Sequence, residues 1–434
     1  MASSWSAPDS AVGARLLQLV ARGQARSRTD LARLLSLAPS TVSLRVQALL
    51  AAGVLTETGD GPSQGGRRPR LLSVNAGAGH VLMADLGSQH ARIGAMDIGG
   101  GLLAVEEVPL RLADGPAATI AALATAFAEL TGRAAPPGRL LGIGVGIPGP
   151  VDVTTGSVTL PSRMPNWRGF AIQDALAQRF GVPIVVDNDA NLMAVGESRG
   201  RERISDHLVV VKAGAGIGTG VISGGVVHRG AAGVAGDISH VRVGSGGTTP
   251  CSCGNLGCLE TVASGAALVR ELRASGIDVA STADVVAHAQ NAEPTVITAV
   301  RRAGAQLGEV LATVTNFFNP HAVLLGGMLS TSEAFVAAVR SALYERCLPL
   351  ATRALEIERV RAGADAGLLG AGLLCLDAVL DAALHTVPDA APPAGAAAAP
   401  PTVPDAALHT VPDAAPPAGA AAAPPTVPDA APPA

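Results

Sequence analysis

The sequence predicts an α/β protein that carries a helical head and a low-complexity tail. From about Gly79 onward, short apolar strands alternate with helical segments, a pattern typical of α/β folds. The residues before this point have the helical spacing of a winged helix-turn-helix, and the segment Asp381–Pro404 is repeated unchanged at Asp405–Pro428. This Ala- and Pro-rich repeat lacks the apolar surface to fold and is expected to be disordered. We therefore expect a head at 1–75, a body at 76–380 and a tail at 381–434.

The head is expected to contain three helices and a wing. Leucines and a valine at helical spacing predict a first helix over Ala14–Ala21, and Thr29 is expected to cap the second helix. Pro39 suits the first turn of the third helix, which is expected to end before Gly53. The wing is expected at 56–72, where the sequence GGRRPR places three arginines on a loop.

Charge is distributed unevenly along the chain. Up to Asn75, nine arginines against four acidic residues leave the head at +5, whereas the whole chain has a formal net charge of -4. A basic head on an acidic body is typical of a DNA-binding module, although a protein-interaction domain with a solvated basic loop would have the same composition. The expected DNA contacts are Ser40, Thr41, Ser43 and Arg45 on the third helix and Arg67, Arg68 and Arg70 in the wing.

The body is expected to contain two successive sets of strands and helices. Three strands at 81–87, 92–98 and 102–110 open the first set, with a hairpin turn at Gly99–Gly101. The later elements are expected, in chain order, as a helix at 117–130, a strand at 140–149, a helix at 172–180, a strand at 182–189, strands at 207–214 and 321–327, a helix at 332–346, a strand at 356–363 and a helix from 368.

Three of the five cysteines lie close together in the second set. Cys251, Cys253 and Cys258 form a CxC pair followed by a third thiol, and His240 lies a short way upstream. Three thiolates and one imidazole complete a closed tetrahedral site, which is the composition of structural zinc. A cluster of free thiols or a redox pair is the alternative. We expect one structural Zn²⁺ ion.

The same stretch resembles the ROK family (repressors, open reading frames and sugar kinases). The family pattern is Glu-x-Gly-His followed by Cys-x-Cys-Gly-x-x-Gly-Cys-x-Glu, and this chain reads Asp237-Ile238-Ser239-His240 followed by CSCGNLGCLE. The resemblance extends from Arg15 to Leu376. It implies a two-lobed actin-like ATPase (sugar kinase) fold for the body, and the repressor branch of the family carries a winged helix-turn-helix head.

The resemblance also implies a sugar site. In the kinases of the family, the Asp of an Asn-Asp-Ala element is the general base that takes a proton from the sugar hydroxyl, and this role carries over to Asp189. A carboxylate at a strand end also commonly caps the helix that follows it, so both roles are open for Asp189. The full implied set of sugar contacts is Gly156, Asn188, Asp189, Asp237, His240 and Glu260.

The nucleotide side of the resemblance is weaker. The family's first phosphate loop is Asp-x-Gly-Gly-Thr, whereas this chain has Gln89 in place of the threonine, and its second loop has Ala215 where the kinases have another. The implied nucleotide contacts are Asp85, Gly87, Gly214, Gly216, Gly218, Gly326 and Gly327. Phosphoryl transfer depends almost entirely on positioning and charge stabilisation, so we expect ATP and Mg²⁺ to bind weakly and turnover to be slow or absent.

Together these observations predict a sugar-responsive transcriptional regulator, a repressor by resemblance, with operator DNA on the head and a sugar or sugar-phosphate effector in the body. An ATP-dependent sugar kinase is the alternative. We expect a homodimer or homotetramer, because two-fold proteins read two-fold operators. We also expect a cytoplasmic protein with no membrane partner, because no apolar run is long enough to span a bilayer.

Overall fold

The computed structural model describes residues 7–21, 23–61, 68–159, 164, 166–200 and 206–385. Arg67 and the repeats from 386 onward therefore lie outside the described residues. The last helix reaches His385, so the first residues of the segment predicted as tail are helical.

The head is a winged helix-turn-helix, as predicted. It consists of α1 (Ala7–Ala21), α2 (Arg28–Leu35), α3 (Pro39–Ala51) and the antiparallel wing strands β1 (Leu55–Asp60) and β2 (Arg70–Val74). Val42, Val46 and Leu49 of α3 are fully buried at helical spacing.

The N-cap of α2 differs from the prediction. It is Ser27 and not Thr29, because the Ser27 hydroxyl accepts a hydrogen bond from the N–H of Asp30 at 3.2 Å. Asp30 returns the contact by accepting from the N–H of Arg26 at 3.1 Å and from the Ser27 hydroxyl at 2.9 Å. This reciprocal arrangement satisfies donors that the first turn of a helix leaves free.

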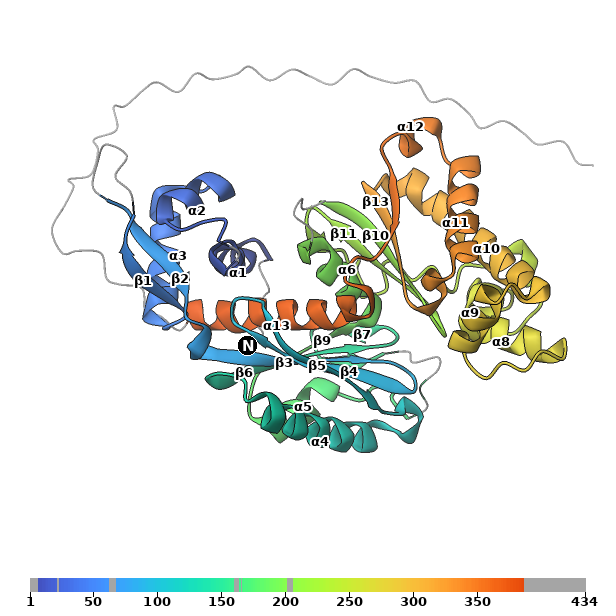
Figure 1. Cartoon of the computed structure of the whole chain (residues 1–434), viewed down its shortest axis with the longest axis horizontal. Coiled ribbons are helices and arrows are strands. Elements are labelled where there is room, and N and C mark those ends of the chain that lie inside the picture. Colours follow the sequence, from blue (N-terminus) through green and yellow to red (C-terminus); the bar gives the residue numbers. More distant parts are fainter. Residues whose placement is uncertain are drawn as a thin grey trace, which may run out of the picture. The chain divides into compact units, whose positions relative to one another are not determined.

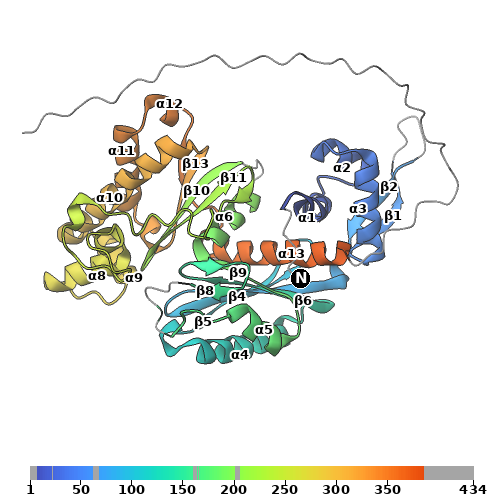
Figure 2. The same ribbon diagram turned by 180° about the vertical axis from the view of Figure 1, so that it is seen from behind.

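The body has two lobes built on the same strand order (Figures 1 and 2). The lobe 1 sheet runs β5-β4-β3-β6-β9, with β3, β4 and β5 antiparallel and β6 and β9 parallel to β3. The lobe 2 sheet runs β12-β11-β10-β13-β14 with the same pattern of directions. This duplication confirms the two sets of elements expected from the sequence.

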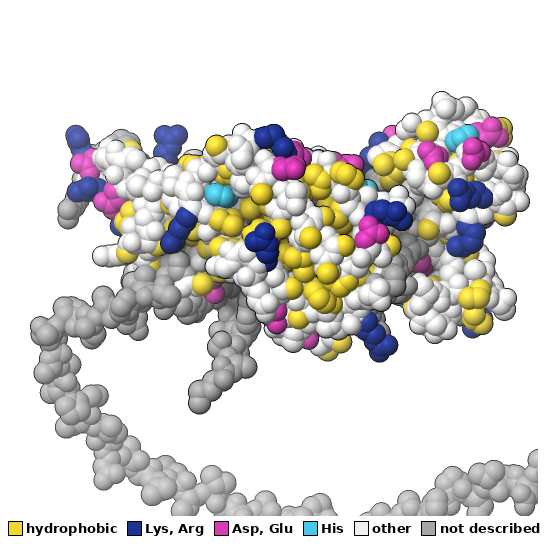
Figure 3. All heavy atoms as spheres, turned by 90° about the horizontal axis from the view of Figure 1, so that it is seen from below, with side chains coloured by type: hydrophobic (Ala, Val, Ile, Leu, Met, Phe, Trp, Pro, Cys, Tyr) yellow, Lys and Arg dark blue, Asp and Glu magenta, His cyan; other side chains and the backbone are white. Residues whose placement is uncertain are grey.

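The lobe 1 elements are β3 (Gly79–Leu86), β4 (His90–Asp97), β5 (Leu102–Pro109), α4 (Pro116–Ala134), β6 (Arg139–Ile147), α5 (Ile172–Phe180) and β9 (Ile184–Asn188). A small hairpin of β7 (Val151–Asp152) and β8 (Ser157–Val158), which the sequence did not suggest, lies between β6 and α5. Figure 3 views the side on which α4 and α5 lie, where hydrophobic side chains are interspersed with charged ones. Small residues make up most of the exposed face of α4, with Glu129 and Arg133 as its exposed charges.

The lobe 2 elements are β10 (His207–Ala213), β11 (Ile217–Ser223), β12 (Val226–Val227), α7 (Glu260–Ala263), α8 (Gly265–Ala274), α9 (Thr282–Gln290), α10 (Pro294–Phe318), β13 (Ala322–Gly326), α11 (Glu333–Arg346), α12 (Pro349–Thr352) and β14 (Glu356–Arg359). Gly218, which was expected in a glycine-rich phosphate loop, belongs with Ile217 to β11, and this strand pairs along its whole length with β10.

Two helices, α6 (Asp189–Gly200) and α13 (Ala366–His385), pack tightly against each other. A Cβ atom at Gly196 would collide with the backbone of α13, and one at Gly370 would collide with the backbone of α6. An ion pair between Arg199 and Asp377 adds a polar contact between the helices. Burial raises the pKa of the Asp377 carboxyl, although Arg199 opposes this change.

The helix α13 also joins the body to the head. It packs on β3 and β6 of lobe 1 and on α1 of the head, as both ribbon views show (Figures 1 and 2). Leu16 and Leu17 of the head share one hydrophobic core with Leu373, Leu376 and Leu380 of α13. The head and lobe 1 are therefore stabilised by common apolar contacts.

The stretch at 363–382 corrects one expectation. The expectation that no apolar run is long enough to cross a bilayer is wrong, because this stretch suffices by length and composition alone. In the protein, 56% of its apolar window is buried. Its packing on α6, β3 and β6 is that of a core helix.

Candidate functional site

The predicted metal ligands lie together. The Nδ1 atom of His240 and the Sγ atoms of Cys251, Cys253 and Cys258 all lie within 4.8 Å of one another. The Sγ atoms of Cys253 and Cys258 are 3.7 Å apart, and His240 Nδ1 lies 3.4 Å from Cys251 Sγ. Tetrahedral zinc with bonds of about 2.0–2.3 Å separates its ligand atoms by roughly 3.4–3.8 Å. The four residues therefore form a group that can hold a metal ion.

Two of these thiols have shifted pKa values. Burial, together with the two neighbouring thiols, raises the pKa of Cys258 to about 12. Burial also opposes ionisation of Cys253, but hydrogen bonds from the Asn255 N–H and the neighbouring thiols outweigh it and lower its pKa.

The loop that carries the cysteines depends on close backbone contacts. Gly257 has φ +72°, and a Cβ atom there would lie 2.6 Å from the carbonyl oxygen of Gly247. After Cys258 the chain returns alongside the histidine segment, because the N–H of Glu260 donates to Ser239 at 2.8 Å. The metal cluster and the expected sugar contacts of this region are thus parts of one local structure.

Both carboxylates in this region already have partners within the protein. Glu260 is buried, and its Oε2 accepts from the N–H of Ile217 at 2.9 Å, which fixes the start of β11. Asp237 accepts from the hydroxyl and the N–H of Ser239 at 2.6 Å and 3.3 Å. These contacts orient the two side chains that the resemblance assigns to a sugar.

At the junction between β9 and α6, the neighbouring residues Asn188 and Asp189 have different roles. The Asn188 side chain caps α6, because its Oδ1 accepts from the N–H groups of Ala190 and Asn191 at 2.9 Å and 3.2 Å, and its Nδ2 donates to Gly149 at 3.0 Å. Asp189 is the first residue of α6. The capping alternative raised for Asp189 therefore describes Asn188, and the Asp189 carboxylate is engaged elsewhere.

Asp187, to which the sequence analysis gave no role, holds this junction in place. Its side chain is 2% exposed and is paired with Arg229, whose Nε and terminal nitrogen lie 3.0 Å and 2.5 Å from Oδ2. Its Oδ1 accepts from the N–H of Asn188 at 2.7 Å and from Asn191 Nδ2 at 3.0 Å. Arg229 follows β12, so this ion pair connects lobe 2 to the end of β9.

Lys212 is another residue of this region to which the sequence alone assigned no role. Its Nζ lies 2.9 Å from the carboxylate of Asp189 and 3.2 Å from each oxygen of Asp85. Burial raises the pKa of Asp85, and the nearby carboxylate of Asp189 adds to this effect, whereas the ammonium opposes it. One ammonium thus joins an expected nucleotide contact to the expected general base.

Gly156 is not brought into this group by any contact in the described part of the chain. It lies in the turn between β7 and β8 with φ +61°, and a Cβ atom there would collide with the Gln173 side chain of α5. This crowding gives Gly156 a packing reason to be glycine. Its contact with a sugar stays a prediction.

In the head, the recognition helix α3 presents part of the expected DNA-binding set. Ser40 and Thr41 are exposed, whereas Ser43 and Arg45 are half-buried. Leu44 and Gln47, which were not in the expected set, are also exposed and lie about one and two helical turns after Ser40. Period-3.6 spacing from Ser40 would have identified both.

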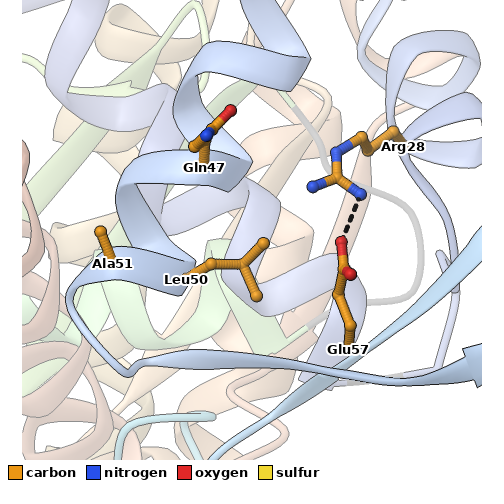
Figure 4. A pocket seen from close by; sticks show the side chains of 5 residues that line it. All are labelled: Arg28, Gln47, Leu50, Ala51 and Glu57. Carbon is orange, nitrogen blue, oxygen red and sulfur yellow. Dashed lines mark hydrogen bonds and ion pairs between the residues drawn. The ribbon is translucent and has the colours of Figure 1, made fainter. Parts of the chain in front are cut away.

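The wing arginines differ in how they are held. Arg70 lies 3.5 Å from Glu57 and 3.8 Å from Asp60, so its charge is partly neutralised within the wing. Glu57 also pairs with Arg28 at 2.9 Å across a shallow depression lined by Gln47 and other residues of α3 (Figure 4). Arg68 is exposed.

The comparisons with known proteins agree with this arrangement. The sequence pattern that defines the ROK family matches residues 81–378. The chain belongs to the ROK family. It is 30% identical over 369 residues to the xylose repressor of Bacillus subtilis (strain 168), and the match covers 84% of this chain and 95% of the repressor.

Two solved ROK structures have the same fold. A ROK transcriptional regulator, described as a homologue of the Escherichia coli Mlc protein, superimposes with a TM-score of 0.70 at 26% identity and covers 87% of this chain and 98% of its own. A ROK glucokinase from Streptomyces griseus, solved with glucose and AMPPNP, gives a TM-score of 0.61 at 28% identity and covers 68% of this chain and 99% of its own. The actin-like body is thus common to regulators and kinases of the ROK family.

The residues that the ROK resemblance assigns to a nucleotide are used within the protein. The carbonyls of Gly214 and Ala215 accept from the first N–H groups of α8 at 2.9 Å and 3.0 Å, and the N–H of Gly214 donates to Gly216. The N–H of Gly87 donates to His90 within the β3–β4 turn. The remaining glycines, Gly218, Gly326 and Gly327, pack against α6 and β10. Asp85 is likewise paired, with Lys212, and the weak binding of ATP and Mg²⁺ expected from the sequence stays a prediction.

Proposed function

We propose that this ROK protein is a sugar-responsive transcriptional regulator, acting as a repressor, whose head binds operator DNA and whose body binds a sugar effector. The observation that carries the proposal is the winged helix-turn-helix, which shares its hydrophobic core with α13 of the body. Kinase activity alone would not require such a head. The body belongs to the ROK family, and the match to the xylose repressor covers 84% of this chain and 95% of the repressor.

Operator recognition is supported by the exposed face of α3. Ser40, Thr41 and Gln47 offer hydroxyl and amide groups of the kinds that read base edges, and Leu44 offers an apolar contact for a thymine methyl group. Arg68 supplies a charge for phosphate, which gives affinity without sequence preference. A single head of this size makes few contacts, so we infer a homodimer or homotetramer on a two-fold operator.

The effector is a sugar or its phosphate, bound by Gly156, Asn188, Asp189, Asp237, His240 and Glu260. Side chains with many oriented oxygens suit a ligand with many hydroxyl groups. His240 turns Nδ1 to the metal cluster, which leaves Nε2 for the sugar. The metal is Zn²⁺, bound by three thiolates and one imidazole with no open position, and its role is to hold the sugar-binding loop. We also propose that the protein acts in the cytoplasm.

Fluorescence anisotropy with operator DNA tests this function. Full-length protein is titrated into fragments of its own upstream region, and a panel of hexoses, pentoses, amino sugars and their phosphates is then added. We expect the protein to bind its operator with a dissociation constant of about 10⁻⁸ M or tighter at physiological salt. One class of ligand should change this dissociation constant at least about tenfold, which corresponds to a coupling free energy of roughly 1.4 kcal/mol. Equal affinity for operator and random DNA, or no response to any sugar, would contradict the proposal.

The alternative, an ATP-dependent sugar kinase, draws support from the Asn188–Asp189 pair and from the glucokinase likeness. A coupled ADP-release assay with the same sugar panel separates the two functions. Turnover with a sugar and no operator binding would establish the kinase.

A further inference from the structure

Lys212 is the single lysine of a chain whose other basic side chains, apart from nine histidines, are arginines. It is held by two carboxylates at once, with Nζ 2.9 Å from Asp189 and 3.2 Å from both oxygens of Asp85. The three side chains are 22%, 13% and 9% exposed in the order Lys212, Asp189 and Asp85. This is a largely buried ion cluster and not a surface pair.

The cluster connects the two lobes. Lys212 belongs to β10, the central strand of lobe 2, whereas Asp85 lies near the end of β3, the central strand of lobe 1. Asp189 begins α6, which packs on both β10 and β9. A single ammonium therefore bridges the two sheets at the place where each central strand ends.

The charges explain why the side chain there is a lysine. Burial alone would lower the pKa of Lys212, but Asp189 and Asp85 more than reverse this and raise it, so the amine stays protonated. Two carboxylates and one ammonium leave the cluster at a net charge of minus one. A compact ammonium with rotatable donors can contact both carboxylates, whereas the planar fork of arginine suits one carboxylate.

We propose that Lys212 is a built-in cation that occupies the position of a metal–nucleotide complex and holds the lobes together without ATP. Two carboxylates that approach one cation form the kind of oxygen-ligand pair that Mg²⁺ and Mn²⁺ bind, and here the ammonium contacts both and compensates one of their two charges. The N–H of Gly214 already donates to Gly216 and the N–H of Ile217 to Glu260, so these two backbone donors are not offered to a phosphate. The lobes are then held together at this point without a nucleotide.

This inference is compatible with the proposed sensor function and explains why a kinase-like body would respond to sugar alone. It does not depend on the identity of the sugar or of the operator. The test below uses neither ligand, so its failure is distinguishable from a failure of the proposed function.

The experiment measures Mn²⁺ binding by electron paramagnetic resonance, with and without ATP, on the full-length protein and on Lys212→Met. Methionine has similar length and no charge, and it leaves Asp85 and Asp189 as an uncompensated pair. We expect no saturable Mn²⁺ or Mn²⁺–ATP binding in the unaltered protein beyond a background shared by all variants. The Lys212→Met variant is expected to gain Mn²⁺ affinity of at least about tenfold over that background.

A second variant guards against loss of folding. Removing Lys212 leaves two buried carboxylates close together, so Lys212→Met is expected to melt at lower temperature, and added Mn²⁺ is expected to restore the melting temperature. Asp85→Asn/Lys212→Met removes this repulsion and should melt near the unaltered protein while losing the gained Mn²⁺ binding. Saturable Mn²⁺–ATP binding by the unaltered protein would overturn the proposal. So would a Lys212→Met protein that gains no Mn²⁺ affinity or whose melting temperature Mn²⁺ does not raise.

Discussion

Replacing Asp187 with asparagine should destabilise the body and weaken sugar binding together. The Asp187 carboxylate is 2% exposed and accepts four hydrogen bonds, two from Arg229 and one each from Asn188 and Asn191. Asparagine keeps the shape but removes the charge, which leaves the guanidinium without its counter-ion. Breaking a buried ion pair by removing one partner costs about 3–5 kcal/mol. Because Arg229 is 28% exposed, we expect the lower end of this range, about 3 kcal/mol.

The assay is urea unfolding of four proteins: the unaltered chain, Asp187→Asn, Arg229→Gln and the double variant. If the pair acts as a unit, the two single changes will not add, and the interaction energy will exceed about 1 kcal/mol. Asp278→Asn, at an exposed loop position, is the matched control and should stay within roughly 0.5 kcal/mol of the unaltered protein. Sugar affinity should fall for Asp187→Asn, because the N–H of Asn188 loses a charged acceptor at 2.7 Å. Additive effects of the two single variants would refute the reasoning.

Three further predictions concern the metal, the DNA and the reaction. Metal analysis should find close to one zinc per chain, and Cys253→Ser should lose the zinc together with effector binding. The control Cys347→Ser, at a buried thiol outside the cluster, should keep both. Full effector affinity in a zinc-free variant would disprove the coupling. Footprinting should reveal a palindromic or repeated operator. Arg68→Ala should weaken binding to all DNA sequences and reduce the salt dependence of binding by about 1 in slope, whereas Ser43→Ala should alter sequence preference. Protection of one unrepeated half-site at saturation would count against this prediction. Asp189→Asn should perturb sugar affinity and leave phosphorylation undetectable, and sugar-dependent ADP release by the unaltered protein at roughly 1–100 per second would overturn that expectation.

Much of the architecture was predictable because it depends on local patterns. The extent of α5 follows from apolar spacing between Ala171 and Gly181, and the Gly99–Gly101 turn between β4 and β5 follows from its glycines. The cap of α2 was placed two residues late because Ser27 and Thr29 are both good caps, and the choice depends on the reciprocal bonds of Asp30. The strand β11 was missed because a glycine-rich stretch is typical of a loop, and its pairing with β10 is what makes it a strand.

The metal cluster was predictable for a similar reason, since Cys251, Cys253 and Cys258 lie close in sequence. Lys212 and Arg229 were not, because their partners are distant in sequence. Asp85 precedes Lys212 by 127 positions and Asp187 precedes Arg229 by 42. No local period relates such residues, so only the parallel pairing of β6 with β3 and β9, and the packing of α6 on β10, bring them together.

The glycines of the expected phosphate loops have packing roles of their own. A Cβ atom at Gly218 would lie 3.0 Å from the Cβ of Ala190, and one at Gly326 would lie 2.6 Å from the sulfur of Met193, so both positions must be small for α6 to pack on lobe 2. Gly327 has φ +80°, and a Cβ atom there would lie 2.5 Å from the carbonyl oxygen of Ala213. These glycines are required by the fold whether or not a phosphate binds. Packing of this kind does not require a threonine hydroxyl, and the two threonine positions of the kinase pattern are Gln89 and Ala215 in this chain. Glycines that the fold needs are present and hydroxyls that only a phosphate needs are absent, which is the pattern expected of a body that keeps the kinase architecture for sensing.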